Sequence, residues 1–106
     1  MLAGRRRLGD ARRGMHRVHL TIHGFVQGVG FRGTVCSAAR SLGVTGWVAN
    51  RHDGAVELEA EGELGPLGAF VARARVGPPH ARVERVEERW EEGPARHRSF
   101  VIRSIP

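Results

Sequence analysis

Alternating apolar and polar residues predict β-strands in two parts of this chain. Between residues 18 and 23, and again between residues 56 and 61, every second side chain is apolar, which is the spacing of a strand with one buried face. The apolar members are Val18, Leu20, Ile22, Val56, Leu58 and Ala60. The polar positions of the second segment are Glu57, Glu59 and Glu61, so we expect an acidic face turned to solvent there.

Two other segments have the spacing of helices with one apolar face. Phe31, Val35, Ala38, Ala39 and Leu42 recur every three or four residues, and Gly43 is well suited to end that helix. The second apolar series is Leu64, Leu67, Val71 and Ala74. It runs into the sequence Gly-Pro-Pro at residues 77–79, which predicts the end of the second helix.

Shorter patterns complete the fold. Residues 44–50, 81–90 and 99–102 suit three further strands, and Asp53-Gly54 predicts a hairpin turn. Val83 and Val86 have opposite parity, which predicts a β-bulge. The order is β-α-β-β-α-β with a terminal strand, so we predict the α+β, ferredoxin-like split βαβ fold, an antiparallel sheet with two helices on one face.

The charge of the chain narrows the class of ligand. The 106 residues include 17 basic residues, all arginine, and 11 acidic residues, which gives a net charge of +6. Residues 1–14 contribute +4 but show no apolar period, so we expect an Arg-rich disordered extension before a domain at 15–106. Residues 15–52 contribute another +4 with no acidic residue, and residues 53–106 contribute −2. This charge favours one small anionic ligand, and we do not expect a nucleic-acid partner.

Composition excludes several other classes. The single cysteine, Cys36, excludes an internal disulfide framework and a Cys-rich zinc site. No apolar run approaches the roughly 18–20 residues of a membrane span. The Arg-rich start lacks the apolar core of a secretory signal. We therefore expect a cytoplasmic protein with no membrane partner.

The candidate chemistry lies in the glycine-rich segment that leads from the first strand into the first helix. Gly24, Gly28 and Gly30 allow backbone N–H groups to converge on an anion, and the helix N-terminus adds its dipole. Arg32, in the first helical turn, offers a planar fork that can grip two phosphate oxygens. Two structural interpretations stay open, a plain tight turn for the glycines and a solvated arginine for Arg32. Asn50, at the end of a strand, is either a turn residue or a side chain that holds a water molecule.

Two sequence motifs resemble the signatures of the acylphosphatase family. The segment from Ile22 to Arg32 has an apolar residue and a glycine followed by Val-Gln-Gly-Val-Gly-Phe-Arg. The segment from Gly46 reads Gly-Trp-Val-Ala-Asn and continues with glycines at 54 and 62 and a valine at 56. Residues 99–102, Ser-Phe-Val-Ile, resemble the closing strand of the family. The resemblance covers about residues 15–106, which would form an acylphosphatase-like domain.

The resemblance implies a function and a site. Members of the family hydrolyse the carboxyl–phosphate anhydride of acyl phosphates to a carboxylate and inorganic phosphate, with no metal or cofactor. By resemblance, Arg32 and Asn50 are the catalytic residues, and Asn50 positions the attacking water. The phosphoryl group would be bound by the Arg32 side chain and by the backbone amides of Gln27, Gly28, Val29, Gly30, Phe31 and Arg32. We expect a monomer that acts on a small acyl phosphate.

Rival interpretations use the same residues. His23 and His52 could serve as a base, but we interpret them as strand-edge and turn residues, and Cys36 as a packing residue. A non-catalytic phosphate- or RNA-binding module of the same fold is the alternative function. RNA binding would need aromatic residues clustered on the sheet face, and the acidic strand at 56–61 argues against it. Domains that process carbamoyl phosphate within larger maturation factors share the same motifs.

Overall fold

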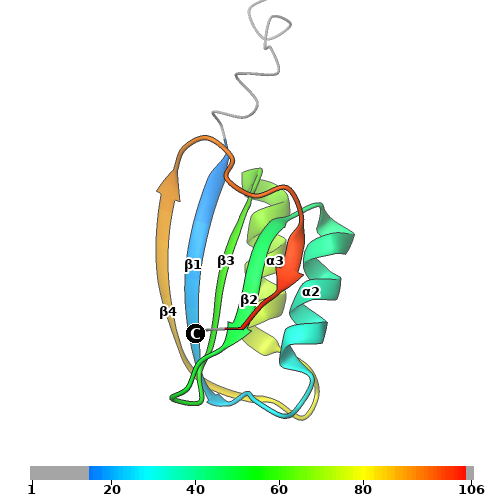
Figure 1. Cartoon of the computed structure of the whole chain (residues 1–106), viewed down its shortest axis with the longest axis vertical. Helices are drawn as coiled ribbons and strands as arrows, with labels where there is room; N and C mark the ends of the chain where they lie inside the picture. Colours follow the sequence, from blue (N-terminus) through cyan, green and yellow to red (C-terminus); the bar gives the residue numbers. More distant parts are fainter. Residues whose placement is uncertain (1–14, 105–106) are drawn as a thin grey trace, which may run out of the picture.

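The computed structural model describes residues 15–104, in which five strands and two helices follow one another (Figure 1). They are β1 (His16–Phe25), α2 (Phe31–Leu42), β2 (Thr45–Asn50), β3 (Val56–Gly62), α3 (Leu64–Val76), β4 (Arg82–Glu92) and β5 (Phe100–Ile102). The expected disordered extension at 1–14 lies outside the described residues. Neither described helix is long and apolar enough to cross a membrane.

The strands form one sheet in the order β4-β1-β3-β2-β5. β1 pairs antiparallel with β3 and β4, and β2 pairs antiparallel with β3, which confirms the predicted split βαβ arrangement. The prediction of an antiparallel sheet is wrong for one pair, because β5 runs parallel to β2. The chain leaves β4 at the end of the sheet where β2 begins, crosses that end through residues 93–99, and enters β5 beside Gly46.

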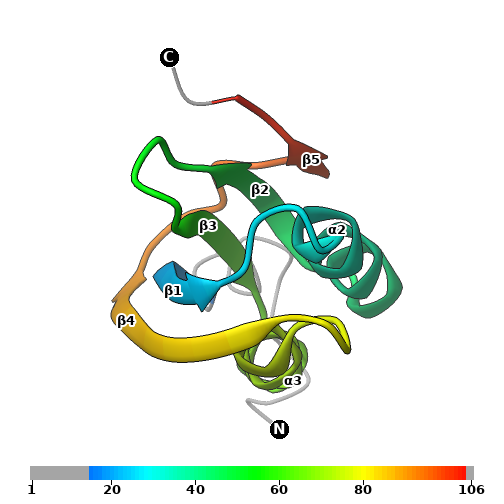
Figure 2. The same ribbon diagram turned by 90° about the horizontal axis from the view of Figure 1, so that it is seen from below.

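Both helices cover the same face of the sheet, as predicted, and the core lies between the two layers (Figure 2). α2 lies against β2 and β5, and α3 against β1, β3 and β4. Phe70 of α3 packs on Phe100 of β5 with ring centroids 5.7 Å apart, so the last strand is joined to the core by its first residue. The largest fully buried apolar side chains are Phe31, Phe70, Phe100, Leu20, Ile22, Leu58 and Leu67.

The predicted bulge in the strand at 81–90 is present. Gly24 lies opposite Val83 while His23 lies opposite Arg85, so β4 contains one extra residue, Glu84, at this step. The bulge moves Val83 and Val86 to the same face of the sheet, and both pack against the core despite their opposite parity.

The other face of the sheet is less open than the sequence suggests. Glu61 of β3, expected at the surface, is 1% exposed and forms an ion pair of 3.0 Å with the buried Arg17 of β1. One carboxylate oxygen of Glu61 also accepts hydrogen bonds from the backbone N–H groups of Arg96 and His97. The expected solvated acidic face is therefore wrong for Glu61, because the 93–99 segment covers it and supplies donors.

Candidate active site

The loop between β1 and α2 presents a helix N-terminus with no side-chain cap among the described residues. Gly30, the N-cap residue, has φ 82° and ψ 19°, and Gly28 has φ 77°, a left-handed conformation that favours glycine. The first turn of α2 contains no acidic residue. The first N–H groups of a helix have no partner within it, so they remain available to an anion.

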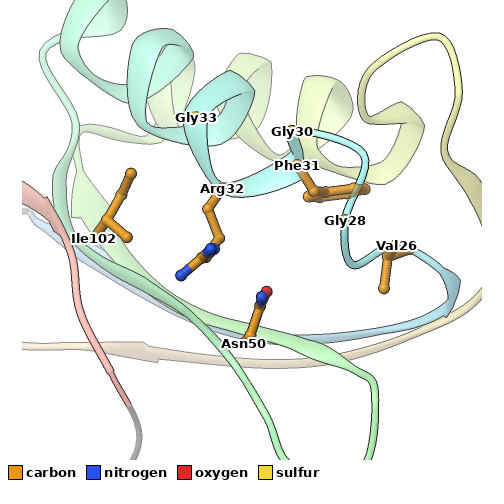
Figure 3. A pocket seen from close by; sticks show the side chains of 8 residues that line it. All are labelled: Val26, Gly28, Gly30, Phe31, Arg32, Gly33, Asn50 and Ile102. Atoms are coloured by element: carbon orange, nitrogen blue, oxygen red, sulfur yellow. The ribbon is translucent and has the colours of Figure 1, made fainter.

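A pocket of about 210 Å³ opens at this helix end (Figure 3). Arg32 extends from the first turn of α2, Asn50 extends from the end of β2, and the two side chains point toward each other across the pocket. The remaining lining residues are Val26, Gly28, Gly30, Phe31, Gly33 and Ile102. The structure thus brings together Arg32 and Asn50, which belong to two separate motifs and lie 18 residues apart in the sequence.

The guanidinium of Arg32 has no ion pair or hydrogen bond within the described part of the chain, whereas several other arginines pair with carboxylates. Arg17, Arg51, Arg75 and Arg85 each contact a glutamate or an aspartate. A cation at the N-terminus of a helix opposes the helix dipole, at a cost of about 0.3–1 kcal/mol near the surface. A bound anion would offset this cost, so the position of Arg32 favours anion binding.

Asn50 is held by the tight hairpin that follows it. The Arg51 N–H donates to the Ala55 carbonyl at 2.8 Å, and the Gly54 N–H donates to the Arg51 carbonyl at 3.3 Å. The Asp53 carboxylate accepts hydrogen bonds from the Ala55 N–H and from the Arg51 guanidinium, and these bonds hold the pKa of Asp53 below its ordinary range. The hairpin therefore gives the half-buried Asn50 a defined backbone position at the pocket wall.

The predicted phosphate-loop residues do not all line this pocket. Gly28, Gly30, Phe31 and Arg32 line it, but Val29 packs against the core. Gln27 lines a neighbouring pocket of about 400 Å³, which Arg32 and Asn50 share with Arg51, His52, Arg103 and Ser104. The Gln27 side chain donates to the carbonyls of Arg51 and Ala55, so its amide nitrogen is directed at the hairpin.

Sequence reasoning missed the contribution of the last strand. Ile102 lines the main pocket and Arg103 lines the neighbouring one, where its guanidinium lies 3.9 Å from the centroid of the Trp47 ring. The Arg103 N–H donates to the Val48 carbonyl, which fixes the backbone beside β2. No local pattern indicates this, because the contact depends on the pairing of β5 with β2.

The other candidates lie apart from the main pocket or at its edge. His23 Nε2 is 3.5 Å from a carboxylate oxygen of Glu87, on the side of β1 that faces β4. Cys36 is buried, with Sγ 3.8 Å from the Phe100 carbonyl, as a packing residue would be. Only His52 of the three lines a pocket that includes Asn50. Within residues 15–104, no group of three or more His, Cys, Asp or Glu residues is arranged to hold a metal ion.

Comparison with known proteins places this geometry in a family. A family model described as Acylphosphatase matches residues 18–102. The chain is 54% identical over 76 residues to an acylphosphatase of Thermococcus kodakarensis, covering 72% of this chain and 84% of that protein. It is 47% identical over 88 residues to an acylphosphatase of Roseiflexus, covering 83% of this chain and 95% of that protein.

Solved structures of similar proteins support the same family. The crystal structure of acylphosphatase from Bacillus subtilis superposes with a TM-score of 0.79 at 36% identity, over 82% of this chain and 97% of that one. Full-length HypF, in its phosphate- and nucleotide-bound form, superposes with a TM-score of 0.71 at 27% identity, over 85% of this chain but only 12% of HypF. Sequence, fold and family model together show that this chain belongs to the acylphosphatase family, hydrolases that act on acid anhydrides.

Proposed function

We propose that the pocket between α2 and β2 is where the acylphosphatase reaction occurs. In this proposal the Arg32 guanidinium and the backbone N–H groups of residues 27–32 bind the phosphoryl oxygens, and Asn50 positions the attacking water. The observation that supports it most directly is the Arg32 side chain, which has no partner among residues 15–104 and faces Asn50 across the pocket at an open helix N-terminus. An anion bound there would meet both a cation and unpartnered N–H donors.

The chemistry needs only positioning and electrostatic stabilisation. Water attacks phosphorus, the bond between phosphorus and the bridging oxygen breaks, and the carboxylate leaves with the electron pair of that bond. The transition state of phosphoryl transfer is loose, with charge on its peripheral oxygens, which preorganised donors stabilise well. Asn50 is not a base, so in this proposal the water proton passes to a phosphate oxygen.

The dimensions of the two pockets suit a small substrate. We propose that the pocket of about 210 Å³ receives the phosphoryl group and that the neighbouring pocket of about 400 Å³ receives the acyl group. Arg32, Asn50 and the loop amides supply the groups that the proposed reaction needs, so we propose that the protein acts as a monomer. We further propose that the reaction needs no metal ion. We also propose that the protein is cytoplasmic, where the buried Cys36 thiol would stay reduced.

The test is hydrolysis of benzoyl phosphate, measured with and without a chelator. Arg32→Ala and Asn50→Ala should each lower kcat/KM by about 10²–10³, the usual effect of removing a donor that stabilises developing charge. Arg32→Lys should recover only part of the loss, because lysine keeps the charge without the planar fork. Arg73→Ala is the matched control, since Arg73 is exposed on α3 and lines neither pocket. We expect it to remain within twofold of the wild type.

Three results would count against this proposal. Turnover that survives both Arg32→Ala and Asn50→Ala would remove the site assignment. Loss of activity in the presence of the chelator would show that the reaction needs a metal ion. Binding of inorganic phosphate with no turnover in the wild type would favour a non-catalytic phosphate-binding module.

A further inference from the structure

The Gln27 side chain forms a bridge between the two halves of the candidate site. Its Nε2 donates to the Arg51 carbonyl at 2.8 Å and to the Ala55 carbonyl at 2.9 Å. Gln27 belongs to the phosphate loop, and the two carbonyls belong to the hairpin that begins immediately after Asn50. Both hydrogens of the amide nitrogen are thus used in contacts between segments 24 and 28 residues apart.

The hairpin does not need Gln27 in order to close. The Ala55 carbonyl already accepts from the Arg51 N–H at 2.8 Å, and the Arg51 carbonyl accepts from the Gly54 N–H at 3.3 Å. A carbonyl oxygen has two lone pairs, so Gln27 uses the acceptor capacity that these turn bonds leave free. The turn of the hairpin is therefore complete without Gln27, and the two Gln27 hydrogen bonds serve only to link the loop to the hairpin.

That link connects the two groups whose separation matters most for the reaction. On one side are the Gly28 and Gly30 backbone and Arg32, and on the other is Asn50, one residue before the first Gln27 acceptor. In-line attack requires the water and the phosphorus to be held within a few tenths of an ångström. A loop with two left-handed glycines has freedom to shift unless something outside the loop restrains it.

We propose that Gln27 is a positioning residue that sets the distance between the phosphate-binding loop, residues 27–32, and the water held by Asn50. This inference rests on the proposed function. It assigns to the Gln27 side chain a role separate from the backbone amide that binds phosphate. The side chain acts on the catalytic rate through Asn50, and the affinity for phosphate stays with Arg32 and the loop amides.

Gln27→Met tests the proposal, because methionine has a similar length and no donor. We expect kcat for benzoyl phosphate to fall by about 10–100-fold, since a displacement of about 1 Å can cost 10² in rate. The inhibition constant of inorganic phosphate should change by less than threefold. In an Asn50→Ala background, Gln27→Met should cause no further loss of kcat, because the partner that it aligns is gone.

Gln27→Glu gives a second, independent readout. At neutral pH its carboxylate would face two carbonyl oxygens and repel them, while at acid pH the protonated group can donate one hydrogen bond. The kcat of this variant relative to the wild type should therefore rise as the pH falls. Arg85→Met is the control: it removes an exposed hydrogen bond to Glu87, lines neither pocket, and should leave kcat within twofold at both pH values.

The outcomes separate this inference from the function on which it rests. An unchanged kcat in Gln27→Met, or a loss that adds fully to that of Asn50→Ala, would overturn the positioning role and leave the tests on Arg32 and Asn50 intact. A parallel weakening of phosphate inhibition would make Gln27 a binding residue instead. If Gln27→Met does not fold, a relative kcat of Gln27→Glu that is flat with pH would overturn the proposal.

Discussion

Gly46 shows how one residue sets the geometry of the strand that carries Asn50. It has a φ of 145° in β2, and a Cβ at this position would collide with the carbonyl of Glu59 in the neighbouring strand. The motif at residues 46–50 begins with this glycine, and the structure shows the physical reason for it. The close approach of two backbones leaves no space for a side chain.

Gly46→Ala should therefore destabilise the protein by about 3 kcal/mol, the scale of a strained backbone position with a steric clash. Gly68→Ala is the matched control, because Gly68 lies within α3 and a Cβ there would meet nothing within 4 Å. That control should stabilise the protein by about 0.5–1 kcal/mol, since alanine favours the helix. Urea unfolding measures both changes. Equal effects of the two substitutions would contradict the clash.

At the scale of elements, the β2–β3 hairpin couples turn chemistry to the site. Asp53-Gly54 predicts the turn from sequence, and the structure adds what the Asp53 carboxylate does there. It accepts from the Ala55 N–H and from the Arg51 side chain, and so joins the two ends of the turn. Arg51 and Ala55 are also the residues whose carbonyls accept from the Gln27 amide, so the bonds of the turn and the bonds to the loop meet at the same two residues.

Asp53 should make hairpin stability depend on pH on the acid side. The hydrogen bond from Ala55 and the hydrogen bonds from Arg51 lower the pKa of Asp53 below its ordinary value of 3.8. The contribution of the carboxylate is therefore present above pH 3.8 and is lost as the pH falls through the lowered folded-state pKa. We expect wild type to have a higher Tm than Asp53→Asn at pH 6, and this difference to shrink below pH 3.8. A difference that grew toward acid pH would have the wrong sign for this mechanism.

At the scale of the whole molecule, one buried ion pair joins the sheet to the segment that delivers β5. Arg17 of β1 contacts Glu61 of β3, Glu91 of β4 and the carbonyl of Pro94. Burial acts to lower the pKa of Arg17, but the hydrogen bonds to Glu61 and Glu91 outweigh it and raise that pKa above its ordinary value. The cluster holds the 93–99 segment against the sheet and so supports Ile102 at the pocket wall.

Arg17→Met should destabilise the fold by about 3–5 kcal/mol, because it leaves the Glu61 carboxylate buried without its cation. The comparison is Arg85→Met, which removes a pair with Glu87 in which both side chains are more than half exposed. An exposed pair contributes at most about 1 kcal/mol. Denaturant unfolding of both variants gives the difference. Similar losses would mean that burial of the Arg17 pair has no special importance.

The order of the elements, the bulge in β4 and the loop before α2 could be predicted from the sequence, because apolar period, turn chemistry and glycine placement act over a few neighbouring residues. The catalytic roles of Arg32 and Asn50 were predicted from the resemblance to a family, since local patterns alone left a solvated arginine and a turn residue as alternatives. The pairing of the charges, the burial of Glu61, the parallel direction of β5 and the contact of Gln27 with the hairpin could not be predicted from the sequence. Each of these depends on residues far apart in the chain, and the energy of a charge or an amide is set by its neighbours in space rather than in sequence.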